Sequence, residues 1–373
     1  MKFRNPKIIV YRVFDIAEEV ELRKAEELLR TRIRENPGRL ELKMKGQQAV
    51  IIREAPVRFS LGLESLPELE SKLPPPRLSA TLWNYGALSI SYQFDLGATA
   101  TQDDFFRYSV LLNEDEKLIQ ALNENAKAKA GEVILMLRDA LQKPQIWNEF
   151  EDYIIYLSDG TDENWTSEQL IDDGDVPEII MGEPEHELAP DIRARLLENT
   201  FQYGNDDLCV IDWNSAFVLE PASQSDVLDV LEFSLSHQLE LRFYDHLIDS
   251  RLQQLYTSLE EDRKRFPLVK ILRGSFSQVA EEASSTYLEL SEFTERMGNS
   301  LKAIGDFYLA RIFRAALQRF RTRDWEESIG RKMDLLSKIP TLLQNEVNTR
   351  RGHLLEIIII LLIAYEIIMA YVR

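Results

Sequence analysis

The chain has 373 residues, one cysteine and a formal net charge of −19. Because domains commonly run to about 100–200 residues, this length suits one large or two modest domains. Cys209 alone excludes an internal disulfide framework and a multi-cysteine metal site. The acidic balance predicts a surface that repels nucleic acid, so we expect no nucleic-acid partner.

The first half of the chain mixes strand and helix patterns. Apolar alternation within residues 82–96 is typical of a half-buried strand. Strand patterns occur at residues 7–14, 82–96, 153–157 and 208–219. Helical patterns occur at residues 17–34, 101–112 and 125–141. This mixture predicts an α+β fold, with an acidic α/β-type N-terminal domain over residues 1–222.

Residues 158–187 form a strongly acidic segment, with eleven Asp or Glu residues and no Lys or Arg. We interpret it as a solvated, mobile loop, because it is too polar to bury much surface. The alternative is a cation site at Asp172, Asp173, Gly174 and Asp175. That cluster lacks the spacing of a calcium-binding loop and its closing glutamate.

Long amphipathic helices are predicted over residues 223–351, forming a bundle or a stalk. Pro340 is expected to kink the last of them, because proline removes a backbone donor. A basic run fits either a solvated face that partners the acidic domain or a contact with anionic lipid head groups. Its members are Arg311, Arg314, Arg319, Arg321 and Arg323.

Residues 352–373 are predicted to form a C-terminal transmembrane anchor, the rival interpretation being a buried core helix. Eleven Leu or Ile residues between 354 and 372 favour insertion by about 3–7 kcal/mol. Glu356 and Glu366 each oppose it by about 2.5–3.5 kcal/mol if they lie deep. We therefore expect Glu366 to be neutral or to face another helix, which makes Glu356 and Glu366 candidate membrane or oligomer contacts. Arg350 and Arg351 before the span predict a single-pass membrane protein whose soluble part is cytoplasmic.

No catalytic motif is present in the sequence. It contains no glycine-rich phosphate loop, no H-E-x-x-H and no G-x-S-x-G. His237 and Glu240 have the spacing of a ligand pair, but on an amphipathic helix such pairs usually mark the wet edge. Cys209 lies in a strand-like run and is interpreted as buried packing. We expect no catalytic residue, no metal, no cofactor and no enzymatic activity.

Two stretches resemble the family of proteins required for meiotic nuclear division. One is Tyr85-Gly86 followed by the strand-like Ala87-Leu88-Ser89-Ile90, and the other is residues 355–363 followed by Glu366-Ile367. The resemblance implies a membrane-anchored, non-enzymatic protein that oligomerises, and it supplies no catalytic residues. The architecture also resembles that of CorA-like magnesium channels. Those carry a Gly-Met-Asn motif, whereas residues 297–299 here read Met-Gly-Asn.

The leading hypothesis is a membrane-anchored scaffold or adaptor that forms a homo-oligomer. Its expected partners are a lipid bilayer and an unidentified protein. The alternative is a CorA-like ion-handling or pore-forming oligomer, suggested by Glu366 within the apolar run.

Overall fold

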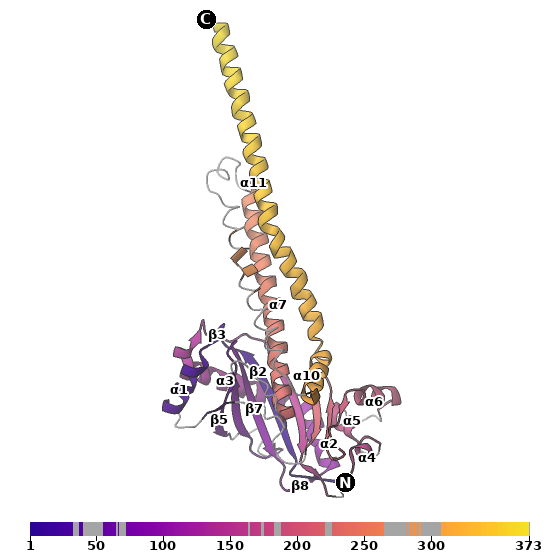
Figure 1. The fold of residues 1–373 in the computed structure, drawn as a ribbon. Helices are drawn as coiled ribbons and strands as arrows, with labels where there is room; N and C mark the ends of the chain where they lie inside the picture. The colour runs from indigo at the N-terminus through magenta and orange to yellow at the C-terminus, as the bar shows by residue number, and fades with distance from the viewer. Residues whose placement is uncertain are drawn as a thin grey trace. The chain divides into compact units, whose positions relative to one another are not determined.

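The computed structural model consists of two compact units, Met1–Phe243 with Ser300–Arg323 and Tyr244–Asn299 with Asp324–Arg373. It describes residues 1–32, 37–39, 55–64, 66, 72–162, 165–172, 175–182, 188–220, 226–264, 281, 284–285, 287–288, 291 and 307–372. Figure 1 shows the strands gathered in the N-terminal part of the chain and the longest helices in its C-terminal part. The prediction of an α+β protein with an N-terminal sheet domain and C-terminal helices is therefore confirmed.

In the described part of the chain, nine strands form the main sheet, in the order β12-β13-β14-β10-β2-β7-β6-β5-β4. Neighbouring strands are antiparallel except β10 and β14, which are parallel. The strands are β2 (Lys7–Asp15), β4 (Gly38–Arg39), β5 (Val57–Leu63), β6 (Arg77–Leu82), β7 (Ala87–Asp95), β10 (Phe150–Ser158), β12 (Thr200–Phe201), β13 (Leu208–Ile211) and β14 (Ser215–Leu219).

Two smaller sheets lie beside the main one. One has the order β11-β1-β8 and the other pairs β3 with β9. Their strands are β1 (Lys2–Arg4), β3 (Glu19–Val20), β8 (Thr99–Thr101), β9 (Leu141–Gln142) and β11 (Gly160–Thr161).

The first unit contains the shorter helices, and two long helices run from it into the second unit. The helices are α1 (Leu22–Arg32), α2 (Gln102–Glu114), α3 (Glu116–Leu137), α4 (Ser167–Asp172), α5 (Val176–Met181), α6 (Pro190–Leu197), α7 (Asp226–Lys264), α10 (Phe307–Arg319) and α11 (Thr322–Val372), with a 3₁₀ turn at Arg138–Ala140. Thr101 caps α2 through a reciprocal capping box with Asp104, as the sequence signal at residue 101 predicts.

The central strand β2 is covered on both faces, which explains its nearly continuous apolar sequence. Successive side chains of a strand point to opposite faces. Ile8 and Val10 therefore lie in a core with Leu122 of α3. Ile9 and Tyr11 lie in a second core that includes side chains of α7 and α10.

The acidic segment at residues 158–187 is more ordered than a mobile loop. Its described residues include β11, α4 and α5, and Leu170, Ile179 and Ile180 are fully buried. The loop prediction is wrong for this part because a few apolar side chains anchor the acidic sequence to the core. Of the candidate cation cluster, Asp173 and Gly174 lie outside the described residues.

One other local prediction needs correction. Residues 208–219 form an antiparallel hairpin, β13 and β14, instead of one strand. Pro340 lies within α11, which continues past it, and the kink expected there stays a prediction. Proline removes one hydrogen-bond donor, and the remaining bonds of a long helix are sufficient to continue it.

A membrane-crossing helix needs about 20 predominantly apolar residues. Within the residues that the structure describes, no helix satisfies both the length and the apolarity that a crossing requires. The predicted transmembrane helix at residues 352–373, the tail anchor and the single-pass membrane localisation are therefore wrong.

The turn between β6 and β7 depends on Gly86. Trp83 N–H donates to the Ala87 carbonyl at 3.0 Å, and Ile16 N–H donates to the Gly86 carbonyl at 3.0 Å. Gly86 has φ +101°, and a Cβ atom there would fall inside the van der Waals radius of the Ala17 carbonyl oxygen. Only glycine accommodates both the positive φ and this close backbone approach.

Gly86→Ala should therefore destabilise the first unit by about 3 kcal/mol or more, because backbone strain and a clash add together. Gly97→Ala is a matched control, since Gly97 has φ +94° but nothing within 4 Å of its Cβ position. It should cost only the strain, about 1–2 kcal/mol. Urea denaturation of both variants measures the difference, and equal losses would show that the Ala17 contact contributes nothing.

Candidate functional site

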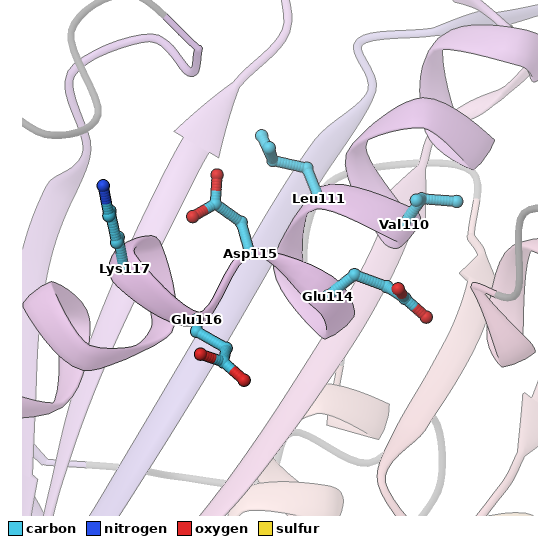
Figure 2. A pocket seen from close by; sticks show the side chains of 6 residues that line it. All are labelled: Val110, Leu111, Glu114, Asp115, Glu116 and Lys117. Carbon is cyan, nitrogen blue, oxygen red and sulfur yellow. The ribbon is translucent and has the colours of Figure 1, made fainter.

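The clearest surface hollow among the described residues lies where α2 meets α3. Its volume is about 530 Å³, and it is lined by Val110, Leu111, Glu114, Asp115, Glu116 and Lys117. Figure 2 shows the carboxylates of Glu114 and Glu116 pointing to the same side, away from the Lys117 ammonium. Asp115 caps α3 by accepting from Leu118 N–H at 3.1 Å. A hydrogen bond from Lys72 and this capping bond lower the pKa of Asp115.

The lining of this hollow does not assign it a catalytic role. It includes no histidine, cysteine, serine or threonine, and its ionisable side chains are those of Glu114, Asp115, Glu116 and Lys117. Within the described chain, no group of three or more His, Cys, Asp or Glu side chains is placed to hold a metal ion. The hollow is an acidic surface feature, and we assign it no reaction.

A layer of buried polar residues lies between the first half of α7 and the main sheet. At one end, Arg58 of β5 pairs with Asp229 at 2.8 Å and with Glu232. Burial would lower the pKa of Arg58, but Glu232 and Asp229 outweigh it and the net shift is upward. Burial raises the pKa of Asp229 to about 6, with Arg58 partly opposing. This end of the layer is a charged pair that fastens α7 to β5.

The other end of the layer is a second arginine pair. Arg242 of α7 contacts Glu149 at 2.5 Å and also Glu151 of β10. Glu151 is buried, and burial raises its pKa to about 7 although Arg242 opposes the shift. The two ends of the layer therefore hold α7 to two different strands, and each uses an arginine that is already engaged by carboxylates.

The middle of the layer contains no arginine. Tyr85 and Ser236 of α7 share a hydrogen bond of 2.6 Å between their hydroxyl groups. Glu240 lies one turn further along α7 and is 0% exposed. Asp15, the last residue of β2, is 3% exposed. The middle of the layer is therefore a pair of buried carboxyl groups beside a tyrosine.

His237 and Glu240 are not at the wet edge of α7, so that prediction is wrong. Both are buried, at 1% and 0% exposed. Serines at 234 and 236 and apolar residues at 235 and 239 surround them, and all of these are buried too. The helix is buried around nearly its full circumference here, and α10 covers part of it through the stacking of Phe233 on Phe313. Its periodicity does not reveal this burial, because a polar residue predicts an exposed face. Sequence reasoning also missed Asp15, whose only signal is a charge at the end of an apolar strand.

Cys209 of β13 is 1% exposed, and burial raises the pKa of its thiol. A buried thiol with a raised pKa is a poor nucleophile at neutral pH. The prediction that Cys209 is a packing residue is therefore confirmed.

The end of α11 is the other candidate contact site. Lys332 of α11 pairs with Asp245 and Asp249 of α7, each at 2.7 Å, within the second unit. Further along α11, twelve large apolar side chains between Leu355 and Met369 are 43–63% exposed, in the yellow part of the helix in Figure 1. Glu356 and Glu366 lie on this stretch and are exposed. Their role as oligomer contacts stays a prediction.

Of the basic run, Arg319 pairs with Asp212 at the end of β13, while Arg311 lies over the ring of Phe201. Both contacts attach α10 to the acidic sheet domain. They agree with the interpretation of this run as a partner for that domain.

Known proteins with similar sequences show the family of this chain. A family model described as "Uncharacterized protein MJ0711, N-terminal domain" matches residues 5–226. "Uncharacterized protein MJ0711" of Methanocaldococcus jannaschii is 25% identical over 179 residues, which cover 48% of this chain and 53% of that protein. The match thus spans about half the length of this relative. No solved structure matches the chain.

The predicted membership of the required-for-meiotic-nuclear-division family is wrong, because the family match is to a different domain. The two stretches that carried the resemblance are short. A glycine such as Gly86 is required in many tight hairpin turns, whatever the family. A run of aliphatic residues in a helix is likewise common to many families and does not distinguish between them. The matched residues instead cover the whole sheet and end at the first residue of α7. The chain belongs to the family defined by the N-terminal domain of the MJ0711 protein.

Proposed function

We propose that this protein is a non-enzymatic scaffold that assembles into a homo-oligomer, and that the contact is made by copies of the apolar end of α11. One observation carries the proposal. Twelve large apolar side chains between Leu355 and Met369 are about half exposed in the single chain. Large contiguous apolar surfaces on a protein usually mark an interaction site.

The sequence of this stretch favours a second copy of the same helix as its partner. Residues Leu355, Ile358, Leu362, Tyr365 and Met369 recur at alternating intervals of three and four. This is the spacing of the contact positions of a coiled coil. Glu356 and Glu366 both lie outside that seam. Identical helices can therefore pack along the seam with neither carboxylate at the centre.

The charges in this stretch also favour self-association over binding to a different protein. Between residues 355 and 369 the charged side chains are two glutamates, so no complementary charge pattern selects a different partner. Aliphatic residues also lie on the sides away from the seam, as Ile360 and Ile363 do. An assembly of more than two helices would cover more of this surface than a dimer does.

The remaining features of the chain support a scaffold in preference to an enzyme. The surface hollow beside α2 has no histidine, cysteine, serine or threonine in its lining. The buried polar groups of α7 are arranged around arginine pairs that hold the helix to the sheet. These contacts build a rigid platform for α7 and expose no reactive group.

Leu362→Lys should dissociate the oligomer, because it places a charge in the apolar seam. We expect the dissociation constant to rise by about a hundredfold or more, since burying an unpaired charge is strongly unfavourable. Leu335→Lys is the matched control, because Leu335 is also an exposed leucine of α11 but lies outside the stretch. Sedimentation velocity of the full chain measures the assembly state. A wild-type protein that sediments as a single chain at all concentrations would refute the proposal.

Glu366→Leu should tighten the association by about tenfold, because it removes a carboxylate that flanks the seam and must lose water on packing. Glu356 lies farther from the seam by helical spacing, so Glu356→Leu should change the association less. Equal effects of the two substitutions would mean that the seam is not the one defined by Leu355, Ile358 and Leu362. The dissociation constants come from the same sedimentation measurements.

A further inference from the structure

We propose that Asp15 and Glu240 form a proton-binding site that fastens α7 to the central strand β2, and that loss of the proton as the pH rises loosens this part of α7. The proposal is independent of assembly through α11. It concerns the middle of the polar layer, which the arginine pairs at its two ends leave unneutralised.

Two contacts fix the position of Asp15 against α7. Asp15 pairs with Ala87 in the register of β2 and β7, and Ala87 follows the turn that contains Tyr85. The hydroxyl of Tyr85 bonds to Ser236 of α7 at 2.6 Å. The strand end that carries Asp15 is thereby tied to the turn of α7 that begins at Ser236.

On its other side, Asp15 is tied to α7 through Trp147. Trp147 N–H donates to the Asp15 carbonyl at 3.0 Å. The Trp147 ring lies edge-on against Phe243, with 5.6 Å between the ring centroids. Glu240 lies between Ser236 and Phe243 at helical spacings of four and three, so all three share one face of α7. The two ties therefore bracket Glu240 and bring it opposite Asp15.

The carboxyl group of Glu240 is buried, and no hydrogen bond among the described residues offsets its loss of water. It is 0% exposed, and neither of its carboxylate oxygens has a hydrogen-bond partner among the described residues. An ionised carboxylate in such a place is very costly, so the group takes up a proton instead. Burial raises the pKa of Glu240 well above its usual range, and the charge of Asp15 raises it further. Burial also raises the pKa of Asp15 to about 8.

Tyr85 and the arginines of the layer do not neutralise the pair. Tyr85 faces Glu240 from the β6–β7 turn, and burial raises the pKa of its hydroxyl, so it stays neutral. His237 lies one turn earlier on α7. The arginines of the layer are held elsewhere, Arg58 by Asp229 and Glu232, and Arg242 by Glu149 and Glu151. A proton is then the cation that relieves the repulsion between Asp15 and Glu240.

The direction of the pH dependence follows from these shifts. Both carboxyl groups have higher pKa values when folded than the usual value of about 4. Their contribution to stability is therefore fully present below about pH 4 and is lost as the pH rises through about 8, the pKa of Asp15. Asp229 and Glu151, with pKa values of about 6 and 7, lose stability in a lower range. The pair should dominate above about pH 7.

The first test is the infrared spectrum of the full chain at about pH 6, between the usual carboxyl pKa and that of Asp15. We expect the band of a neutral, buried carboxyl group in the wild-type protein. Glu240→Gln and Asp15→Asn should each weaken or shift that band, while Glu151, with a pKa of about 7, keeps part of it at this pH. Glu260→Gln, at an exposed position of the same helix, should leave it unchanged. A wild-type spectrum without the band would overturn the proposal.

The second test compares urea unfolding of the wild-type protein and Glu240→Gln between pH 5 and 8. One proton taken up on folding changes the unfolding equilibrium by up to about tenfold per pH unit. We expect the stability of Glu240→Gln relative to wild type to rise by about tenfold or more over this range. Glu260→Gln should show a constant ratio. A constant ratio for Glu240→Gln as well would refute the proton site, whatever the overall stability of the variant.

Amide hydrogen exchange tests the loosening of α7 itself. After correction for the intrinsic effect of pH, exchange at residues 236–243 of the wild-type protein should accelerate between about pH 6 and 8. It should accelerate less in Glu240→Gln, whose side chain stays neutral while Asp15, Asp229 and Glu151 still titrate. Equal pH dependence in the two proteins would show that the pair does not control the packing of α7.

Discussion

The structure depends on the burial of β2 on both of its faces. A strand in the centre of a sheet presents alternate side chains to opposite sides, so its odd and even residues must each find a core. In β2 the even residues lie with α3 and the odd residues with α7 and α10. The helices on both faces of the main sheet and the burial of Arg12 and Asp15 follow from this arrangement.

Two charged residues of β2, Arg12 and Asp15, are buried, and their charges are accommodated in different ways. Arg12 points to the α3 side, where its Nε donates to Asn123 at 2.6 Å and Nη1 donates to the Tyr11 carbonyl at 2.9 Å. Asp15 points to the α7 side, where its charge raises the pKa of the buried Glu240 carboxyl group. A buried cation is thus satisfied by hydrogen bonds, whereas the buried acid pair needs a proton.

The contacts of the chain fall into two kinds. Some hold its helices to the sheet domain, and others are apolar surfaces that no other part of the single chain covers. Arginines 58, 242 and 319 each join a helix to the sheet domain through buried carboxylates. Breaking such a pair leaves an unpaired buried charge, so these residues are structural. The end of α11 differs, because its apolar side chains contact water in the single chain. This exposed apolar surface is the observation on which the proposed scaffold role rests.

The sequence alone determined the elements whose signals are local. Strand β2 follows from an apolar run, and the start of α2 follows from a capping residue, because both depend on a few neighbouring residues. The tertiary structure decided which side chains are buried and which other elements they contact. It buried Asp15 of β2 and Glu240 of α7, buried Leu170 and Ile179 within the acidic sequence, and gave Gly86 its close approach to Ala17. The surroundings of these residues come from parts of the chain far away in sequence, so only the packing of α7 and the loops on the sheet determines them.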